Sequence, residues 1–298
     1  MRKVSVVIPT YNCGARLLHA LQSVAAQSYA LDDIEVLVID DGSTDDTAER
    51  VARFAADSRL QLRYARQHNA GPAAARNHGL RLARGDAIAF LDADDAWQPA
   101  KLALQMPRLA PPVGLVYCDN VFVDADGRVL PDYVRRIGLH RGDILLDLFC
   151  DFFLLTSAVV LTRAVVVAAG GFDERLGVGE DYEFFLRVAQ RCHADYVDAK
   201  LLVRCVRPDS LSRRDYALDA RVDLATLSAF VRANPDFARR HRAAIKRRVA
   251  RYRYDFAWRL LADNRRGEAA VELLRSLRER ASLAAARTLA RTLLPASG

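Results

Sequence analysis

Two groups of carboxylates in this sequence could do chemistry, and the first is Asp92-Ala93-Asp94-Asp95. Carboxylate oxygens are the ligands that hard divalent cations prefer, and a cation held by them can stabilise negative charge on a departing group. An aspartate in a loop can instead cap a helix, and a helix is expected to start near Pro99. The segment therefore predicts a metal-assisted site, with helix capping as the alternative interpretation.

The second group is Glu180-Asp181. One carboxylate of such a pair can act as a general base, which takes the proton from a hydroxyl group while that hydroxyl forms a new bond. Acidic residues also favour the positive N-terminal end of a helix, and a helix is expected over Tyr182–Gln190. Both interpretations stay open at this point.

The elements that must position these side chains alternate along the first half of the chain. Short β-branched runs predict strands, and apolar residues spaced three or four apart predict the helices between them. The predicted strands are Val4–Pro9, Ile34–Ile39, Leu60–Ala65 and Ala87–Leu91, and the predicted helices are Ala15–Ala26, a helix capped by Ser43–Asp46 that ends near Ala56, and Ala73–Ala83. This βαβα alternation predicts an α/β fold with a mostly parallel central sheet and helices on both faces.

Polar segments come after each predicted strand, at the edge where ligands bind in open sheets of this kind. The segments are Pro9-Thr10-Tyr11-Asn12, Asp40-Asp41-Gly42-Ser43, Asn69-Ala70-Gly71-Pro72 and Asp92-Ala93-Asp94-Asp95. We therefore expect one site that collects residues from all four strand ends.

Two further segments complete a pattern that is similar to a known family. Arg76-Asn77 follows Gly71-Pro72, and Gly170-Gly171-Phe172-Asp173-Glu174 leads to Gly179-Glu180-Asp181. Over roughly residues 3–215 the chain resembles a family 2 glycosyltransferase with the GT-A fold, which is Rossmann-like with a mostly parallel central sheet. The resemblance implies a hexosyltransferase-type enzyme that uses a nucleotide-sugar donor and a divalent metal, Mn²⁺ or Mg²⁺.

The resemblance also implies roles for the acidic residues. Asp94 would coordinate the metal at the diphosphate, Asp92 would face the ribose or the metal shell, and Asp95 would support the donor side. Asp181 would be the catalytic base, with Glu180 orienting the acceptor or the loop. A single base without a carboxylate nucleophile predicts inversion at the anomeric carbon.

For the nucleotide, the resemblance implies that Pro9, Thr10 and Tyr11 line the base. It implies that Asp41 accepts a hydrogen bond from the base and that Arg76 approaches base or phosphate. An ion pair of Arg76 with Asp92 or Asp40 is an alternative that could coexist with binding. Asp40 itself could cap a helix or organise its loop.

One position departs from the family pattern. Many relatives carry a His shortly before a Ser-Leu-Ser stretch, and this sequence has Arg207 there. Because Arg has no acceptor atom, it cannot ligate a metal. A contact of Arg207 with phosphate and an ordinary surface role both remain open.

The charge is unevenly distributed along the chain. The 298 residues carry a formal net charge of +7, whereas residues 219–298 hold 18 Lys and Arg against 8 Asp and Glu. Helical spacing replaces the strands there, so we expect a GT-A nucleotide-sugar-dependent catalytic domain at residues 1–218 and a basic α-helical region at 219–298.

Residues 239–258 interleave arginines with aromatic residues. This pattern is typical of a helix that lies on an anionic membrane surface. A helical subdomain packed on the catalytic domain is one alternative. Nucleic-acid binding is another, but no recognisable motif accompanies it, so no nucleic-acid partner is expected.

The composition, 51% hydrophobic and 27% charged, excludes a disordered or collagen-like chain. No leader or bilayer-spanning segment is expected, and five scattered cysteines indicate a reducing compartment. We therefore expect a cytoplasmic protein, which could also bind peripherally to the inner face of the plasma membrane.

The expected function is inverting transfer of a sugar, with UDP-sugar donors favoured, to a saccharide or lipid-linked saccharide acceptor. This activity would serve surface polysaccharide or glycolipid synthesis. The alternative is a catalytically silent protein that binds a nucleotide sugar or a partner.

Overall fold

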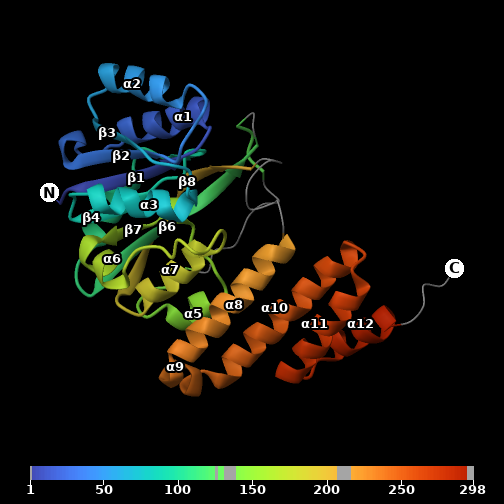
Figure 1. Ribbon diagram of the computed structural model, residues 1–298. Coiled ribbons are helices and arrows are strands. Elements are labelled where there is room, and N and C mark those ends of the chain that lie inside the picture. Colours follow the sequence, from blue (N-terminus) through green and yellow to red (C-terminus); the bar gives the residue numbers. More distant parts are fainter. Residues whose placement is uncertain (1, 125–126, 131–138, 207–215, 294–298) are drawn as a thin grey trace. The chain divides into compact units, whose positions relative to one another are not determined.

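The computed structural model describes residues 2–124, 127–130, 139–206 and 216–293. The chain forms two compact units, the first made of Met1–Leu148 with Phe152–Pro208 and the second of Phe149–Asp151 with Asp209–Gly298 (Figure 1). The roles expected for residues 1–218 and 219–298 stay predictions.

The first unit is built on a central sheet in the order β3-β2-β1-β4-β7-β6-β8-β5. Strands β3, β2, β1 and β4 are parallel neighbours, as predicted. Strand β7 is antiparallel to β4 and β6, β8 is parallel to β6, and β5 is antiparallel to β8. The strands are β1 (Val4–Thr10), β2 (Ile34–Asp40), β3 (Gln61–Arg66), β4 (Ala87–Phe90), β5 (Asp95–Trp97), β6 (Val113–Val123), β7 (Val160–Thr162) and β8 (His193–Cys205).

Helices cover both faces of this sheet, so the predicted α/β fold is confirmed (Figure 1). Successive residues of a strand point to opposite faces. In β1, Val6 and Ile8 pack into the cluster that contains α1, whereas Val7 contacts Gly79 of α3. The helices are α1 (Gly14–Ala25), α2 (Thr47–Asp57), α3 (Gly71–Leu82), α4 (Lys101–Gln105), α5 (Leu145–Cys150), α6 (Arg163–Ala169) and α7 (Glu180–Ala189).

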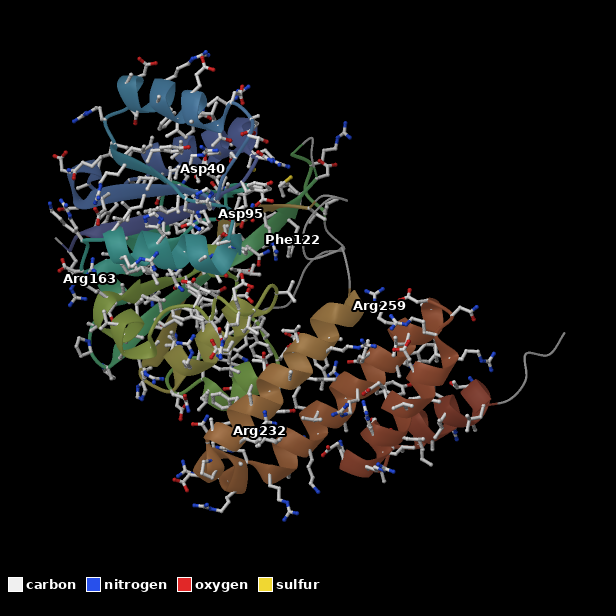
Figure 2. The ribbon with its side chains drawn as sticks, viewed as in Figure 1. Asp40, Asp95, Phe122, Arg163, Arg232 and Arg259 are labelled. Atoms are coloured by element: carbon white, nitrogen blue, oxygen red, sulfur yellow. The ribbon has the colours of Figure 1, made fainter. Side chains whose placement is uncertain are left out.

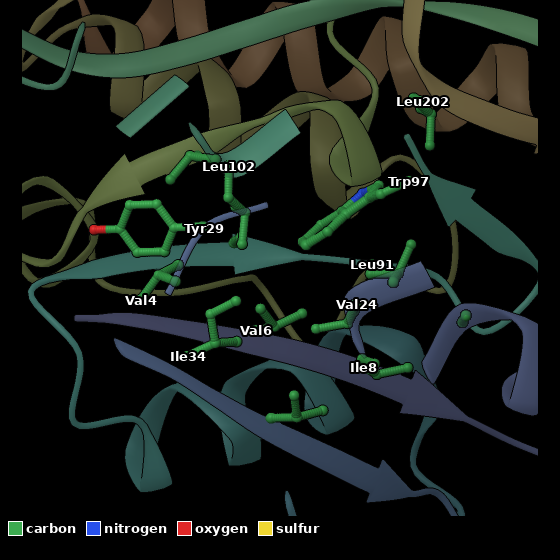
Figure 3. Close-up of a cluster of buried hydrophobic side chains, with 14 of the residues drawn as sticks. Val4, Val6, Ile8, Val24, Tyr29, Ile34, Leu91, Trp97, Leu102 and Leu202 are labelled. Atoms are coloured by element: carbon green, nitrogen blue, oxygen red, sulfur yellow. The ribbon is translucent and has the colours of Figure 1, made fainter. Parts of the chain in front are cut away.

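The main apolar core lies on the α1 side of the sheet (Figure 3). It joins β1 and β2 to α1 and α4 and continues to Trp97 of β5 and Leu202 of β8. Burial of each large apolar side chain there stabilises the fold by about 1.5–3 kcal/mol. The strands β1, β2, β4, β5 and β8 therefore share one apolar core.

The second unit is helical, as predicted, with α8 (Tyr216–Ala233), α9 (Pro235–Arg240), α10 (Arg242–Ala262), α11 (Arg266–Glu279) and α12 (Leu283–Leu293). Its core contains Phe256, Leu260 and Leu273. The buried Glu272 carboxylate of α11 joins this helix to α10 through an ion pair with Arg253 at 2.7 Å, and it also pairs with Arg275 of its own helix at 2.6 Å. In the described part of the chain, no helix is both long and apolar enough to cross a bilayer.

Candidate functional site

A small polar cavity lies in the first unit beside the turn that connects β4 to β5. Its volume is about 180 Å³, and Asp92, Asp95 and Asp181 line it together with Arg204. Figure 2 shows Asp95 in the same unit as Asp40, the last residue of β2. The fold therefore brings the two carboxylate groups that stand out in the sequence to one cavity.

Asp181 lies in the first turn of α7, just after Gly179 in a left-handed conformation with φ of 71°. Its Oδ1 accepts a hydrogen bond of 2.8 Å from the Tyr182 N–H. Burial and the neighbouring charge of Glu180 raise the pKa of Asp181 to about 7, although Arg76 opposes the shift. A carboxylate with this pKa can hold or release a proton near neutral pH, which is what a general base needs.

Asp95 is buried and begins β5, where it pairs with Arg204 of β8 in the strand register. Burial and the charge of Asp92 raise the pKa of Asp95 to about 8, against the charge of Arg204 and a hydrogen bond with Ser157. The position of Asp95 in a strand contradicts the alternative that it caps a helix, and α4 begins only at Lys101.

Arg76 on α3 joins the two carboxylate groups. Its Nη2 donates to Asp92 at 2.8 Å and its Nη1 donates to Glu180 at 2.7 Å, and its side chain is buried. Burial disfavours the charge, but Asp92 and Glu180 outweigh it and raise the pKa of Arg76. The ion-pair alternative for Arg76 is therefore what the structure contains, with Glu180 rather than Asp40 as the second partner.

The loop that leads to Asp181 is held by the next residue of α3. Asn77 Oδ1 accepts from the Phe172 N–H at 2.8 Å, and Asn77 Nδ2 donates to the Phe172 carbonyl at 2.9 Å. Gly171 has φ of 76°, and a Cβ there would lie 2.7 Å from Asn77 Oδ1. Gly171 thus permits both the left-handed turn and the close approach of α3.

Asp40 and Asp41 bind loop backbone. Asp41 Oδ1 accepts from the Ala70 N–H at 2.9 Å, and its Oδ2 accepts from the Gly71 N–H at 2.8 Å at the start of α3. Asp40 Oδ1 accepts from the Ser43 N–H at 2.7 Å. Both aspartates organise loops at the predicted ligand edge, as the alternative for Asp40 expected.

The residues expected at the nucleotide, Pro9 and Thr10 at the end of β1 and Tyr11 directly after it, lie at this edge but do not line the cavity. The Thr10 carbonyl accepts from the Asp41 N–H at 2.8 Å, which ties the ends of β1 and β2 together. Thr10 is buried, Pro9 is half-buried, and Tyr11 is 51% exposed. An exposed aromatic ring at a strand end is free to stack on a flat ligand.

Asp94 and Asp92 are the residues that the sequence predicts to hold a metal. Burial and the charge of Asp92 raise the pKa of Asp94, so a cation near these two carboxylates would stabilise their ionised forms. Within the described ranges, no three His, Cys, Asp or Glu side chains are grouped as a metal site. Mg²⁺ is usually held by one or two carboxylates together with substrate phosphates and water, so this donor set fits a metal that arrives with a diphosphate.

Besides the three aspartates, the cavity is lined by residues that are not predicted from the sequence, among them the polar residues Arg204, Ser157 and Thr156. Arg204 lies near the carboxyl end of β8, His193–Cys205, which the sequence analysis does not predict as a strand. Had this strand been predicted, the expectation that ligands bind at the carboxyl ends of strands would have pointed to Arg204. Ser157 carries no pattern that would single it out. Arg207, the position that departs from the family, lies outside the described residues.

The comparisons with known proteins agree with this fold and site. The sequence model of Glycosyl transferase family 2 matches residues 5–148. The chain is 33% identical over 193 residues to the UDP-Glc:alpha-D-GlcNAc-diphosphoundecaprenol beta-1,3-glucosyltransferase WfaP of Escherichia coli, covering 64% of this chain and 72% of that protein. The chain therefore belongs to glycosyltransferase family 2.

Two further similarities define how far this assignment reaches. An uncharacterized glycosyltransferase of Rickettsia conorii is 44% identical over 205 residues, which are 67% of this chain but only 32% of that relative. The mannosyltransferase PcManGT from Pyrobaculum calidifontis, solved in complex with GDP-Man and Mn²⁺, has a TM-score of 0.66 and 24% identity over 97% of this chain and 79% of that one. This likeness shows that the fold is of the GT-A type.

Proposed function

We propose that this protein is an inverting glycosyltransferase that moves a sugar from a nucleotide-diphosphate donor to a saccharide or lipid-linked saccharide acceptor. The observation that carries the proposal is that Asp92, Asp95 and Asp181 line one cavity. Membership of glycosyltransferase family 2 supports the same activity.

In this proposal Asp181 is the catalytic base. Its carboxylate takes the proton of the acceptor hydroxyl as the oxygen attacks the anomeric carbon, and the bond to the nucleoside diphosphate breaks. Glu180 is engaged by Arg76 at 2.7 Å, so its role is to hold Asp92 and α7 together rather than to accept a proton. One base and one displacement give inversion.

Asp94 and Asp92 would hold Mn²⁺ or Mg²⁺, which when bound stabilises negative charge on the leaving diphosphate. Asp95 supports the donor side, while Pro9, Thr10, Tyr11 and Asp41 form the nucleotide side around the ends of β1 and β2. Arg207 stays a proposed phosphate contact. UDP-sugars are the first donors to test, because the relative WfaP is named for UDP-Glc. GDP-sugars come second, because the structure of PcManGT contains GDP-Man and Mn²⁺.

The setting of the reaction is also a proposal. A lipid-linked acceptor places the enzyme in the cytoplasm, at the inner face of the plasma membrane, in surface polysaccharide or glycolipid synthesis. The relative WfaP is named for a diphosphoundecaprenol-linked acceptor. On α10, Arg247 and Arg251 lie one turn apart, and Trp258 is 52% exposed, so residues 239–258 have the charge and aromatic groups that suit an anionic lipid surface.

The test is a binding and turnover panel of UDP- and GDP-sugars with Mn²⁺, Mg²⁺ or a chelator. We expect one nucleotide to raise the thermal midpoint only with metal, and Asp94→Asn to remove this shift. Asp181→Asn should keep the shift and lose about 10²–10⁴-fold in turnover. A product with the donor's anomeric configuration would overturn the inverting mechanism, and binding without turnover by the wild type would favour the catalytically silent alternative.

A further inference from the structure

The short helical segment η4 (Thr156–Ala158) contacts the acidic turn from its buried side. Ser157 is 1% exposed, and its Oγ accepts the Asp92 N–H at 3.0 Å. The same side chain hydrogen-bonds the carboxyl group of Asp95. One hydroxyl group therefore links both ends of the turn that contains Asp94.

Ser157 is itself held by Trp97 of β5. The Trp97 indole Nε1 donates to the Ser157 carbonyl at 2.8 Å, and the ring is 4% exposed. Figure 3 shows the Trp97 ring within the apolar cluster that also contains Leu102 and Leu202. The position of Ser157 is thus coupled to the rigid core and does not depend on a surface loop.

Helix α4 supports this arrangement with two polar side chains on one face. Lys101 and Gln105 are four residues apart, so both point the same way. Gln105 Nε2 donates to the Ala158 carbonyl at 2.9 Å, next to Ser157. The Lys101 Nζ lies 4.0 Å from the centroid of the Trp97 ring.

Lys101 is unusual because it is fully buried and its Nζ has no hydrogen-bond partner. Burial lowers the pKa of Lys101 to about 8. An apolar side chain of similar length would fill this space at a smaller desolvation penalty. Packing alone therefore does not explain the ammonium group, whose charge lies over the face of the Trp97 ring.

We propose that Ser157 is a positioning residue for the Asp92–Asp95 turn, and that the Lys101–Trp97 pair fixes Ser157 in place. The role in metal and donor binding rests on the function proposed above for Asp92 and Asp94. The hydrogen-bond geometry of the turn does not depend on that function and can be measured separately.

The first experiment is hydrogen exchange on the protein without ligand. Ser157→Ala removes the acceptor of the Asp92 N–H, so exchange at that amide should become about tenfold faster. Ser157→Thr keeps the hydroxyl group and has the adjoining cavity for its methyl group, so it should restore slow exchange. Ser276→Ala is the matched control, because the buried Ser276 Oγ donates to the Ala250 carbonyl in the second unit. It should leave the turn unchanged.

The second experiment measures binding of Mn²⁺ with UDP or GDP, whichever the wild type binds. Loss of such a supporting hydrogen bond should weaken binding about 10–100-fold in Ser157→Ala, with less effect on the acceptor KM than on kcat. Lys101→Met should raise thermal stability and still weaken binding. A purely structural lysine would give higher stability with unchanged binding.

Unchanged exchange at Asp92 in Ser157→Ala would overturn the positioning role of Ser157. Unchanged exchange and binding in Lys101→Met would overturn the role of the Lys101–Trp97 pair. If the wild type bound no nucleotide while the exchange results held, the proposed function would fail and the positioning role of Ser157 would stand.

Discussion

Arg76 and Glu180 lie 104 residues apart in the sequence and form a buried ion pair of 2.7 Å between α3 and the first residue of α7. The second arm of Arg76 holds Asp92 at 2.8 Å. One guanidinium group therefore sets the spacing between the proposed metal side and the proposed base side of the cavity.

Replacing Arg76 by Met should strongly destabilise the protein. The change leaves the carboxylates of Asp92 and Glu180 without their shared partner, and breaking a buried ion pair in this way costs about 3–5 kcal/mol. Urea unfolding monitored by fluorescence measures the effect. The control is Arg53→Met, which breaks the solvent-exposed pair with Glu49 and should leave the midpoint unchanged. Equal stability of the two variants would contradict the role given to Arg76.

Gly171→Ala should reduce both stability and activity. The added Cβ would meet Asn77 Oδ1, and the alanine backbone would have to adopt φ of 76°. We therefore expect the free energy of unfolding to fall by about 1–3 kcal/mol. Because Gly171 lies in the loop that leads to α7, turnover should fall as well. Gly177→Ala is the matched control, since a Cβ there meets nothing within 4 Å. A variant at Gly171 as stable and active as the one at Gly177 would disprove this account.

The pH profile should report the base. Burial and Glu180 raise the pKa of Asp181 to about 7, and a base acts only when it is deprotonated. We therefore expect kcat/KM to fall tenfold per pH unit below about 7 and to level off above it. Steady-state assays in overlapping buffers measure this, and the residual activity of Asp181→Asn should lack this limb. A flat profile from pH 5 to 8 would remove Asp181 from the role of base.

Stability without ligand should also depend on Asp181, in the opposite direction. Its pKa is about 7 in the folded protein and near 3.8 in the unfolded chain, so folding takes up a proton between these values. The favourable contribution is complete below about pH 4 and is lost as the pH rises through about 7. Thermal midpoints of Asp181→Asn should therefore fall less steeply than those of the wild type over this interval. Parallel curves would contradict the raised pKa.

The basic helix α10 offers a test of membrane binding. Arg247, Arg251, Tyr254 and Trp258 share one face by helical spacing. The double variant Arg247→Ser/Trp258→Ser should bind anionic vesicles at least about fivefold more weakly at low salt, since each arginine contributes about 1 kcal/mol near such a surface. The control Arg59→Ser/Val167→Ser removes one exposed cation and one exposed apolar side chain from the first unit. Co-sedimentation of wild type with neutral vesicles alone, or with none, would contradict the proposal.

The sequence alone predicts the first four strands, a mostly parallel sheet and the helices between the strands. These elements depend on local patterns, because apolar periodicity and β-branching act within a few residues of each other. In the helical unit, Pro235 is the first residue of α9, a position where a helix tolerates proline, so the break before it also follows from a local signal. The carboxylates Asp92, Asp94 and Asp181 can also be identified locally, because each lies in a short acidic segment, Asp92-Ala93-Asp94-Asp95 or Glu180-Asp181.

Only the tertiary structure decided how the site is held. Strand β8 places Arg204 beside Asp95, η4 places Ser157 beneath Asp92, and α3 joins Asp92 to Glu180 through Arg76. These partners are separated by 16 to 109 residues, so no local pattern encodes them. The raised pKa of Asp181 likewise depends first on burial, which exists only once the sheet and helices have packed together. The charges of the adjacent Glu180 and of Asp92 in the acidic turn add to the increase, and Arg76 of α3 opposes it.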